Sequence, residues 1–230
     1  GDGAADDDHI AGPYPRRFGT KGRIDPTDAG SHDEGTVAGS PGHHLGIAGD
    51  DHESLAGKIN AGLEADALIT TAGVSMGDRD LVCDVLLSLG VERRFWKVDI
   101  KPGRPTAFGL KNGKPVFSLP GNPVSSMITF DQFVRPALLK MMGHQRVIMP
   151  SVRAVMQETV TKKPGRVQFL RVRVVDDGKM LHASSSGDQN TGILRTLLRA
   201  NGIAFLPVEL EQVTAGEEVE VQLIARVDKV

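Results

Sequence analysis

Short apolar runs alternate with helix-patterned segments between Leu45 and Met142, and this alternation limits the possible folds more than any other feature of the chain. Residues 51–63 place Leu55, Ile59 and Leu63 at helical spacing, and residues 67–71 form an apolar run of strand length. Alternating strands and helices are typical of a parallel sheet that is covered by helices. We therefore expect an α/β fold here, a three-layer domain with a mostly parallel sheet.

The other elements of this region are predicted from their start and stop signals. Residues 81–89 have a helical pattern that Gly90 closes, and residues 95–100 have a strand pattern. Asn112-Gly113 lies between two apolar runs and predicts a hairpin of strands 105–110 and 115–119. Residues 124–142 predict a long amphipathic helix with a kink before Pro136, because proline breaks the helical hydrogen-bond ladder.

The chain changes in character on both sides of this region. Residues 1–44 contain an Asp6-Asp7-Asp8 run with scattered glycine and proline, and they show neither the helical nor the strand period. We expect this segment to be disordered or a non-native leader. Residues 149–230 contain several alternating runs, which predict a small β-rich domain. The predicted domains are therefore 45–148, the α/β domain, and 149–230, the β-rich domain.

Composition excludes several classes of protein. The 230 residues include 27 Lys and Arg against 29 Asp and Glu, so a bulk cationic nucleic-acid binder is excluded. No apolar run is long enough for a membrane helix. One cysteine, Cys83, excludes an internal disulfide framework and favours a reducing compartment. We expect a soluble cytoplasmic protein that binds neither nucleic acid nor membrane.

Turns rich in glycine and polar residues follow two of the predicted strands. In Ser118–Ser125, Gly121 lies before Asn122 at a helix N-cap position, with Ser125 in the first turn. This segment is either an ordinary helix cap or an anion site that uses free backbone N–H groups. In Thr71–Asp80, Thr71 and Ser75 supply hydroxyls, and Gly73 permits a tight turn.

Carboxylates and cations accompany these turns. Asp80 and Asp50 each have two interpretations, as helix-start residues or as magnesium ligands beside a phosphate. Lys101-Pro-Gly-Arg104-Pro105, with Lys97 upstream, is either a solvated turn or an oxyanion clamp. Ligands of open α/β sheets bind beyond the carboxyl ends of the strands. Together these turns indicate a site for phosphate, an oxyanion and a divalent metal.

Polar groups in the β-rich region also have two interpretations. Arg171 and Arg173 share one face of their predicted strand. Either this face is simply exposed to solvent, or the two arginines add to the positive charge of the region. The polar stretch 184–191, which ends at Thr191, either binds an anion or connects two elements.

Three motifs in order, at 71–80, 101–105 and 119–125, resemble those of the molybdopterin molybdenumtransferase family, which includes the E domains of plant and gephyrin-type proteins. Residues 161–171 resemble that family's C-terminal segment. The resemblance covers only a C-terminal part of the family's length. It implies insertion of molybdate into adenylylated molybdopterin with release of AMP, assisted by Mg²⁺. It also implies that the α/β domain is incomplete at its N-terminus and that full-length members form homodimers.

The resemblance also implies roles for particular residues. Asp50 and Asp80 match metal-holding carboxylates, and Lys97 and Lys101 match active-site lysines, so these four are the predicted catalytic residues. The predicted substrate-binding residues are Thr71, Gly73, Ser75, Arg104, Pro105, Gly121, Asn122, Ser125, Arg171 and Thr191. Two of these differ from the usual pattern, with Arg104 in place of Lys and Thr191 in place of Ser. The alternatives are a non-catalytic module that binds molybdopterin or a partner, and an inactive truncated fragment.

Overall fold

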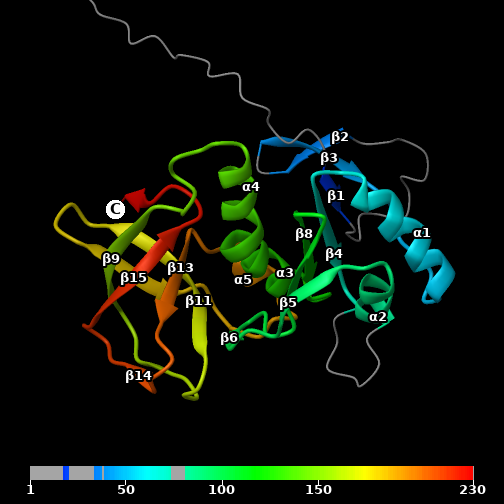
Figure 1. Ribbon diagram of the computed structural model, residues 1–230. Helices are drawn as coiled ribbons and strands as arrows, with labels where there is room; N and C mark the ends of the chain where they lie inside the picture. Colours follow the sequence, from blue (N-terminus) through cyan, green and yellow to red (C-terminus); the bar gives the residue numbers. More distant parts are fainter. Residues whose placement is uncertain (1–17, 21–33, 38, 74–80, 230) are drawn as a thin grey trace, which may run out of the picture.

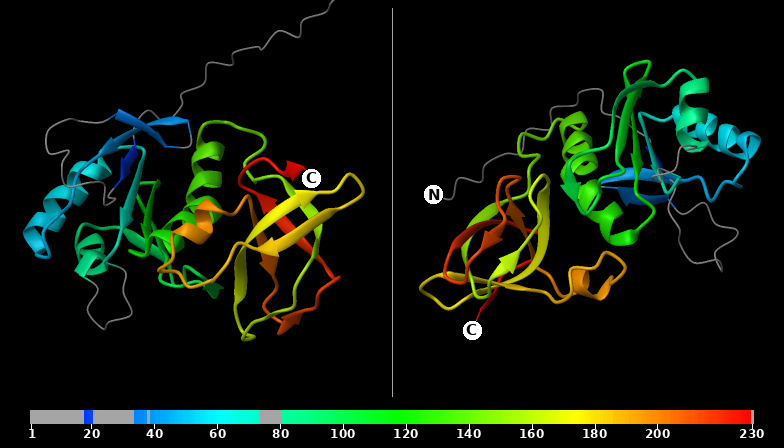
Figure 2. Two further views of the ribbon diagram at one scale, coloured as in Figure 1. Left: turned by 180° about the vertical axis from the view of Figure 1, so that it is seen from behind. Right: turned by 90° about the horizontal axis from the view of Figure 1, so that it is seen from below.

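The computed structural model describes residues 18–20, 34–37, 39–73 and 81–229 (Figure 1). These residues form two parts, an α/β domain followed by a β-barrel. The two views of Figure 2 show the barrel beside the α/β domain, with the strands of the first sheet on one side and those of the barrel on the other.

The first sheet has seven strands in the order β2-β3-β1-β4-β8-β7-β5. The neighbours β3, β1, β4 and β8 are parallel, whereas β2, β7 and β5 pair in antiparallel fashion. The bounds are β1 Phe18–Thr20, β2 Glu34–Val37, β3 Ser40–His44, β4 Ala67–Thr71, β5 Glu92–Trp96, β7 Ala107–Lys111 and β8 Lys114–Leu119.

The expectation of a mostly parallel sheet is therefore wrong, because the sheet is mixed. The predicted hairpin explains part of the difference. Asn112 and Gly113 have φ angles of 52° and 80°, as a two-residue hairpin turn requires, and such a turn can join only antiparallel strands. The predicted hairpin is confirmed, with β7 and β8 paired in antiparallel fashion.

The segment before Leu45 also differs from the expectation of a disordered leader where the structure describes it. Strands β1, β2 and β3 all lie before Leu45, and β1 pairs with both β3 and β4. Strand pairing uses backbone hydrogen bonds, which any composition can make, so an aperiodic sequence does not exclude it. The domain boundaries themselves stay predictions.

Helices cover both faces of this sheet, because successive strand residues point to opposite faces. On one face, α1 (His52–Leu63) and α2 (Leu81–Ser88) pack against Leu68 and Val116. On the other face, Ile69 and Phe117 pack against the helical segment that follows β8. The predicted helices at 51–63 and 81–89 are thereby confirmed, and Asp51 caps α1 by accepting from the Ser54 N–H at 2.8 Å.

The predicted kink before Pro136 takes the form of a change in helix type. The segment runs as α3 (Pro123–Thr129), a π-helical turn η1 (Phe130–Val134) and α4 (Arg135–Met141). Pro136 has no N–H for the carbonyl of Gln132, and the Arg135 N–H instead donates to the carbonyl of Phe130. None of the helices in the described part of the chain has the length and apolar character that a membrane crossing requires.

The C-terminal part is a closed barrel. Its strands follow one another in the order β12-β9-β15-β13-β11, and β11 pairs with β12 to close the ring. Short strands β6 and β16 lie parallel to β11, and β10 pairs with β14. The bounds are β6 Ile100–Lys101, β9 Ser151–Met156, β10 Val160–Thr161, β11 Val167–Asp176, β12 Leu181–Ser185, β13 Gly202–Leu206, β14 Gln212–Val213, β15 Glu218–Leu223 and β16 Asp228–Lys229.

The two parts share an apolar interface. Val124 and Ile128 of α3 pack in one buried cluster with Phe169 of β11 and Leu197 of the short helix α5 (Arg195–Leu198). The Gln132 side-chain amide also donates to Oε1 of Gln222 at 2.6 Å. Strand β6 pairs with β11 of the barrel. The turn 101–105 at the end of β6 therefore has a fixed position relative to both the α/β domain and the barrel.

The turn between β11 and β12 predicts a dependence of stability on pH. Asp177 Oδ2 lies 2.8 Å from His182 Nε2, and Asp177 Oδ1 accepts from the N–H groups of Lys179 and Met180 at 2.8 Å. These bonds lower the pKa of Asp177 from 3.8 to about 2, the bond from His182 most of all. The carboxylate form therefore stabilises the fold above pH 3.8, and this contribution is lost as the pH falls toward 2.

We expect Asp177→Asn to lower the Tm at pH 7, with the difference from the parent chain shrinking between about pH 4 and pH 2. Thermal melts across this pH range measure it, with exposed Glu209→Gln as the control. A Tm difference that stays constant down to pH 2 would contradict the role given to the carboxylate.

Candidate functional site

The loops that carry the predicted motifs meet at one edge of the sheet. Thr71 at the end of β4 lies opposite Leu119 at the end of β8, and Ser118 lies opposite Ala107 at the start of β7. The turns 71–73, 101–106 and 119–122 therefore extend beyond the same edge. We call this the carboxyl edge, and it is where ligands of open α/β sheets bind.

Two of these turns are in direct contact. The Ala72 N–H donates to the carbonyl of Leu119 at 3.1 Å, and Ala72 has a φ of 69°, which non-glycine residues rarely adopt. A side chain at position 121 would place its Cβ 3.0 Å from the Cβ of Ala72. Gly121 thus allows the close approach of the two turns, and a side chain there would force Ala72 to shift. Gly73, with a φ of 78°, continues the first turn.

The turn 101–106 is held by its own hydrogen bonds and by α3. The Val98 N–H donates to the carbonyl of Arg104 at 3.0 Å, and buried Thr106 donates through Oγ1 to the carbonyl of Gly103 at 2.6 Å. Gly103 has a φ of 112°, and a Cβ there would lie 2.3 Å from Thr129 Cγ2. The backbone between Lys101 and Arg104 is thus fixed against α3.

Arg104 presents an unpaired donor at this turn. Its Nε is buried and makes no hydrogen bond with any residue that the structure describes. Its distance to Asp99 Oδ1 is 4.0 Å, too long for a hydrogen bond. Lys97 and Lys101 are close to Arg104 in the sequence and are exposed, and Pro105 is half-buried. A buried guanidinium nitrogen without an acceptor is typical of a site for an anion.

The start of α3 favours the capping interpretation over free backbone donors. Oδ1 of Asn122 accepts from the N–H groups of Val124 and Ser125 at 3.2 and 3.5 Å. Those two N–H groups are therefore already engaged. Ser125 is itself buried, with 6% of its surface exposed, so its hydroxyl lies beneath the carboxyl edge.

The predicted metal carboxylates are only partly described. Asp50 is exposed in the loop after β3, just before the Asp51 cap of α1, and β3 ends at the same edge as β4 through their common neighbour β1. Asp80 and Ser75 lie outside the described residues. Within residues 39–73 and 81–229, no three His, Cys, Asp or Glu side chains lie close enough together to hold a metal.

Arg171 lies in the barrel domain and is buried, with 1% of its surface exposed. Its Nε donates to Thr196 Oγ1 at 2.8 Å, and its Nη2 donates to the carbonyls of Asp188 and Asn190, both at 3.3 Å. Burial lowers the pKa of the guanidinium, and the charge of Asp188 raises it. Thr191 follows Asn190 directly and is half-buried, so the barrel brings Arg171 and Thr191 into one neighbourhood.

The interpretation of both strand arginines as a solvent-exposed face is wrong for Arg171. Only Arg173 is on the surface, where its Nε donates to Asp228 at 2.9 Å. The loop 186–196 and α5 cover the outer face of β11 at Arg171 but not at Arg173, and strand periodicity cannot register such a cover.

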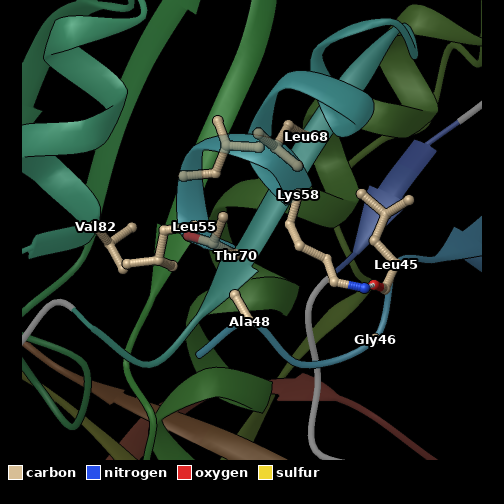
Figure 3. Close-up of a pocket in the computed structure, with 9 residues that line it drawn as sticks. Leu45, Gly46, Ala48, Leu55, Lys58, Leu68, Thr70 and Val82 are labelled. Carbon is tan, nitrogen blue, oxygen red and sulfur yellow. Dashed lines mark hydrogen bonds between the residues drawn. The ribbon is translucent and has the colours of Figure 1, made fainter. Parts of the chain in front are cut away.

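A small cavity lies behind the carboxyl edge, under the loop that leads to Asp50 (Figure 3). Ala48, Leu55, Leu68 and Val82 line it, and Lys58 reaches the carbonyl of Leu45 at its side. Its volume is about 20 Å³, which suffices for about one water molecule. This cavity is therefore part of the packing of α1 and not a substrate site.

Sequence reasoning missed the residues that support the site. Thr106 and Thr129 fix the turn 101–106, and Thr196 holds Arg171. Each is a buried threonine whose partner is distant in sequence or lies in an irregular turn. An isolated threonine gives no signal of this kind.

Comparison with known proteins supports the assignment of both parts. Residues 33–140 match the model of a probable molybdopterin binding domain, and residues 153–224 match that of the MoeA C-terminal region, domain IV. A molybdopterin molybdenumtransferase of Haemophilus influenzae is 34% identical over 166 residues, which cover 71% of this chain and 41% of that protein. Molybdopterin molybdenumtransferase 2 of Mycobacterium tuberculosis is 35% identical over 182 residues, 76% of this chain and 44% of that protein.

A solved structure agrees with these matches. The molybdopterin biosynthesis MoeA protein of Pyrococcus horikoshii superposes with a TM-score of 0.70 and 29% identity, covering 91% of this chain and 54% of that one. The chain thus spans about two fifths of the length of these curated relatives. Because both of its parts match in the family's own order, the chain belongs to the molybdopterin molybdenumtransferase (MoeA) family.

Proposed function

We propose that this chain carries the substrate site of a molybdopterin molybdenumtransferase. The reaction inserts molybdate into adenylylated molybdopterin and releases AMP, which yields molybdenum cofactor. Family membership supports the transferase class and a role in molybdenum-cofactor biosynthesis. The particular substrates are those that the resemblance implies, and the chemistry of the carboxyl edge suits their negative charge.

The observation that carries the proposal is the unpaired donor of Arg104. Its buried Nε makes no hydrogen bond among the described residues, with Asp99 Oδ1 as an ion-pair partner only at 4.0 Å, and it lies on a turn whose backbone is fixed by Thr106 and by the approach of Gly103 to α3. Molybdate is a dianion, and a guanidinium with a fixed backbone binds an oxyanion at little entropic cost. Exposed Lys97 and Lys101 supply the further positive charge that a substrate phosphate requires.

The other residues of the edge position the substrate. Because Gly121 has no side chain, its turn can lie against Ala72, which a side chain at this position would meet. Thr71 ends β4 at the same edge, and we assign Gly73, Pro105 and Asn122 to the shape of the turns. We assign Arg171 and Thr191 to an oxyanion contact from the barrel. The loop 188–191 must rearrange for this contact, because the Nε and Nη2 of Arg171 already donate to Thr196 and to the Asp188 carbonyl. Ser75 completes the proposed set from outside the described residues.

Magnesium is proposed as the metal, held by Asp50 and Asp80. In the described part the donor set is a single exposed carboxylate, Asp50, which suits Mg²⁺ because this ion binds through one or two carboxylates together with substrate phosphate oxygens. Its contribution is to neutralise phosphate charge as AMP leaves. We further propose that the protein is cytoplasmic and that the whole protein acts as a homodimer.

Equilibrium binding of molybdate and of adenylylated molybdopterin to the purified chain tests the proposal. We expect Arg104→Gln to weaken molybdate binding about tenfold or more, because a hydrogen bond to a charged group contributes about 1.5–3 kcal/mol. Arg153→Gln, a change of an exposed arginine on the barrel, is the matched control and is expected to leave binding unchanged.

The release of AMP, followed by chromatography, separates the alternatives. Molybdopterin binding without release of AMP supports a non-catalytic binding module. A chain that binds neither molybdate nor adenylylated molybdopterin refutes the proposed site.

A further inference from the structure

The barrel carries a second polar cavity that the proposed transferase site does not use. It lies on the outer side of β11 and β12, between the end of α5 and β16. In Figure 2, left, the yellow hairpin of β11 and β12 lies beside the red strand β16. The lining residues are Arg173, Val175, Ser184, Ser185, Ser186, Arg199 and Asp228, none of which belongs to the carboxyl edge.

The charged groups of this cavity leave one net positive charge. Arg173 donates through Nε to Asp228 at 2.9 Å, while its two terminal nitrogens make no hydrogen bond within the described part of the chain. Arg199 is exposed at the end of α5, and its guanidinium likewise has no partner among residues 39–73 and 81–229. Two arginines against one carboxylate thus face the same space.

Hydroxyl groups line the floor between these arginines. Ser184 lies directly opposite Arg173 in the pairing of β11 with β12, and both lie on the outer face because Ala183 and Val172 are in the barrel core. Ser186 is more than nine-tenths buried, with 8% of its surface exposed, and its Oγ has no hydrogen-bond partner among the described residues. A buried hydroxyl without a partner is unfavourable unless a ligand supplies an acceptor.

We propose that this cavity is a binding site for a phosphate-class oxyanion, a tetrahedral group that carries two negative charges. The free terminal nitrogens of Arg173 and Arg199 suit the paired oxygens of such a group, and Ser184 and Ser186 donate to those that remain. A dianion matches the excess positive charge of the two arginines better than a singly charged carboxylate does. Asp228 holds Arg173 in place and at the same time competes with the ligand.

The role of Asp228 gives a test in which two variants shift affinity in opposite directions. Binding of inorganic phosphate to the whole chain is measured by calorimetry at low ionic strength. Arg173→Gln and Arg199→Gln are each expected to weaken binding about tenfold or more, since each removes a charged donor. Asp228→Asn is expected to tighten binding several-fold, because it removes a negative charge from the cavity. Arg153→Gln is the matched control on another face of the barrel.

A second variant set separates this site from the carboxyl edge. Arg104→Gln is expected to leave phosphate binding here unchanged, so this proposal and the proposed transferase site can fail independently. Ser186→Ala, which removes only one oxygen atom, is expected to weaken binding about two- to fivefold while the Tm is unchanged or raised. Ribose 5-phosphate, used in parallel, shows whether the phosphate is carried by a larger molecule, which a tighter Kd than that of inorganic phosphate would indicate.

The outcomes are decisive in both directions. Saturable phosphate binding that is weakened in Arg173→Gln, strengthened in Asp228→Asn and kept in Arg104→Gln supports the site. No saturable binding, binding that Arg104→Gln abolishes, or an affinity that Asp228→Asn does not change would overturn it.

Discussion

Replacing Arg171 with alanine is expected to lower the free energy of unfolding by about 3 kcal/mol, through the loss of buried hydrogen bonds to a charged group. The guanidinium is 1% exposed and donates to Thr196 Oγ1 and to the carbonyls of Asp188 and Asn190. All three acceptors would lose this donor in the variant, and of the three the Asn190 carbonyl would keep the Ile193 N–H at 3.2 Å. At roughly 2–4 °C per kcal/mol for a chain of this size, the Tm should fall by roughly 6–12 °C.

Arg173 is a matched control on the same face of the same strand. Its side chain is 60% exposed and its ion pair with Asp228 lies on the surface, where such pairs contribute about 0–1 kcal/mol. Arg173→Ala should therefore change the Tm little. Arg171→Lys should lose most of the stability that Arg171→Ala loses, since an ammonium group cannot reach acceptors on three sides. Urea unfolding of the three variants measures this, and equal effects at Arg171 and Arg173 would refute the structural role.

Gly73→Ala is the second change with a large expected effect, a loss of about 3 kcal/mol. About 1 kcal/mol comes from a side chain at a φ of 78°, and the remainder from overlap with a neighbour. The new Cβ would lie 2.2 Å from Cγ2 of Val82, a stiff β-branched residue that is 4% exposed in α2. The turn at the end of β4 must shift, so we also expect weaker binding at the carboxyl edge.

Gly113 separates the two contributions, because it has almost the same backbone conformation. Its φ is 80°, and a Cβ there meets nothing within 4 Å. Gly113→Ala should cost only about 1 kcal/mol. In a Val82→Ala background the cost of Gly73→Ala should fall toward the same value, since the overlapping methyl group is gone. Equal costs at Gly73 and Gly113 in the parent chain would show that Val82 plays no part.

Local signals in the sequence predicted much of the secondary structure. Asp51 as a helix cap, Gly90 as a helix end and Asn112-Gly113 as a hairpin turn are all confirmed. Each depends on the conformation of one or two residues and on neighbours within four positions, so the sequence carries the whole signal. The motifs at 71–80, 101–105 and 119–125 likewise identified the family, because their order along the chain needs no structure.

Features that depend on distant contacts were not predicted. The closure of the barrel through β11 and β12 and the pairing of β1 with β3 and β4 are set by which strands meet, and strand periodicity does not encode this. The unpaired Nε of Arg104 and the unpaired hydroxyl of Ser186 are also visible only once their surroundings are known.

Arg171 and Arg173 illustrate the difference between what local sequence determines and what distant contacts determine. From the sequence, they are two equivalent arginines at alternate positions of a strand. The tertiary structure makes one the buried centre of a hydrogen-bond network and the other a surface ion pair, because the loop 186–196 covers only the first. The sequence by itself determined the strand and the shared face. Burial, and with it the chemistry open to each guanidinium, was decided by the loop, since solvent exposure depends on contacts made across the whole fold.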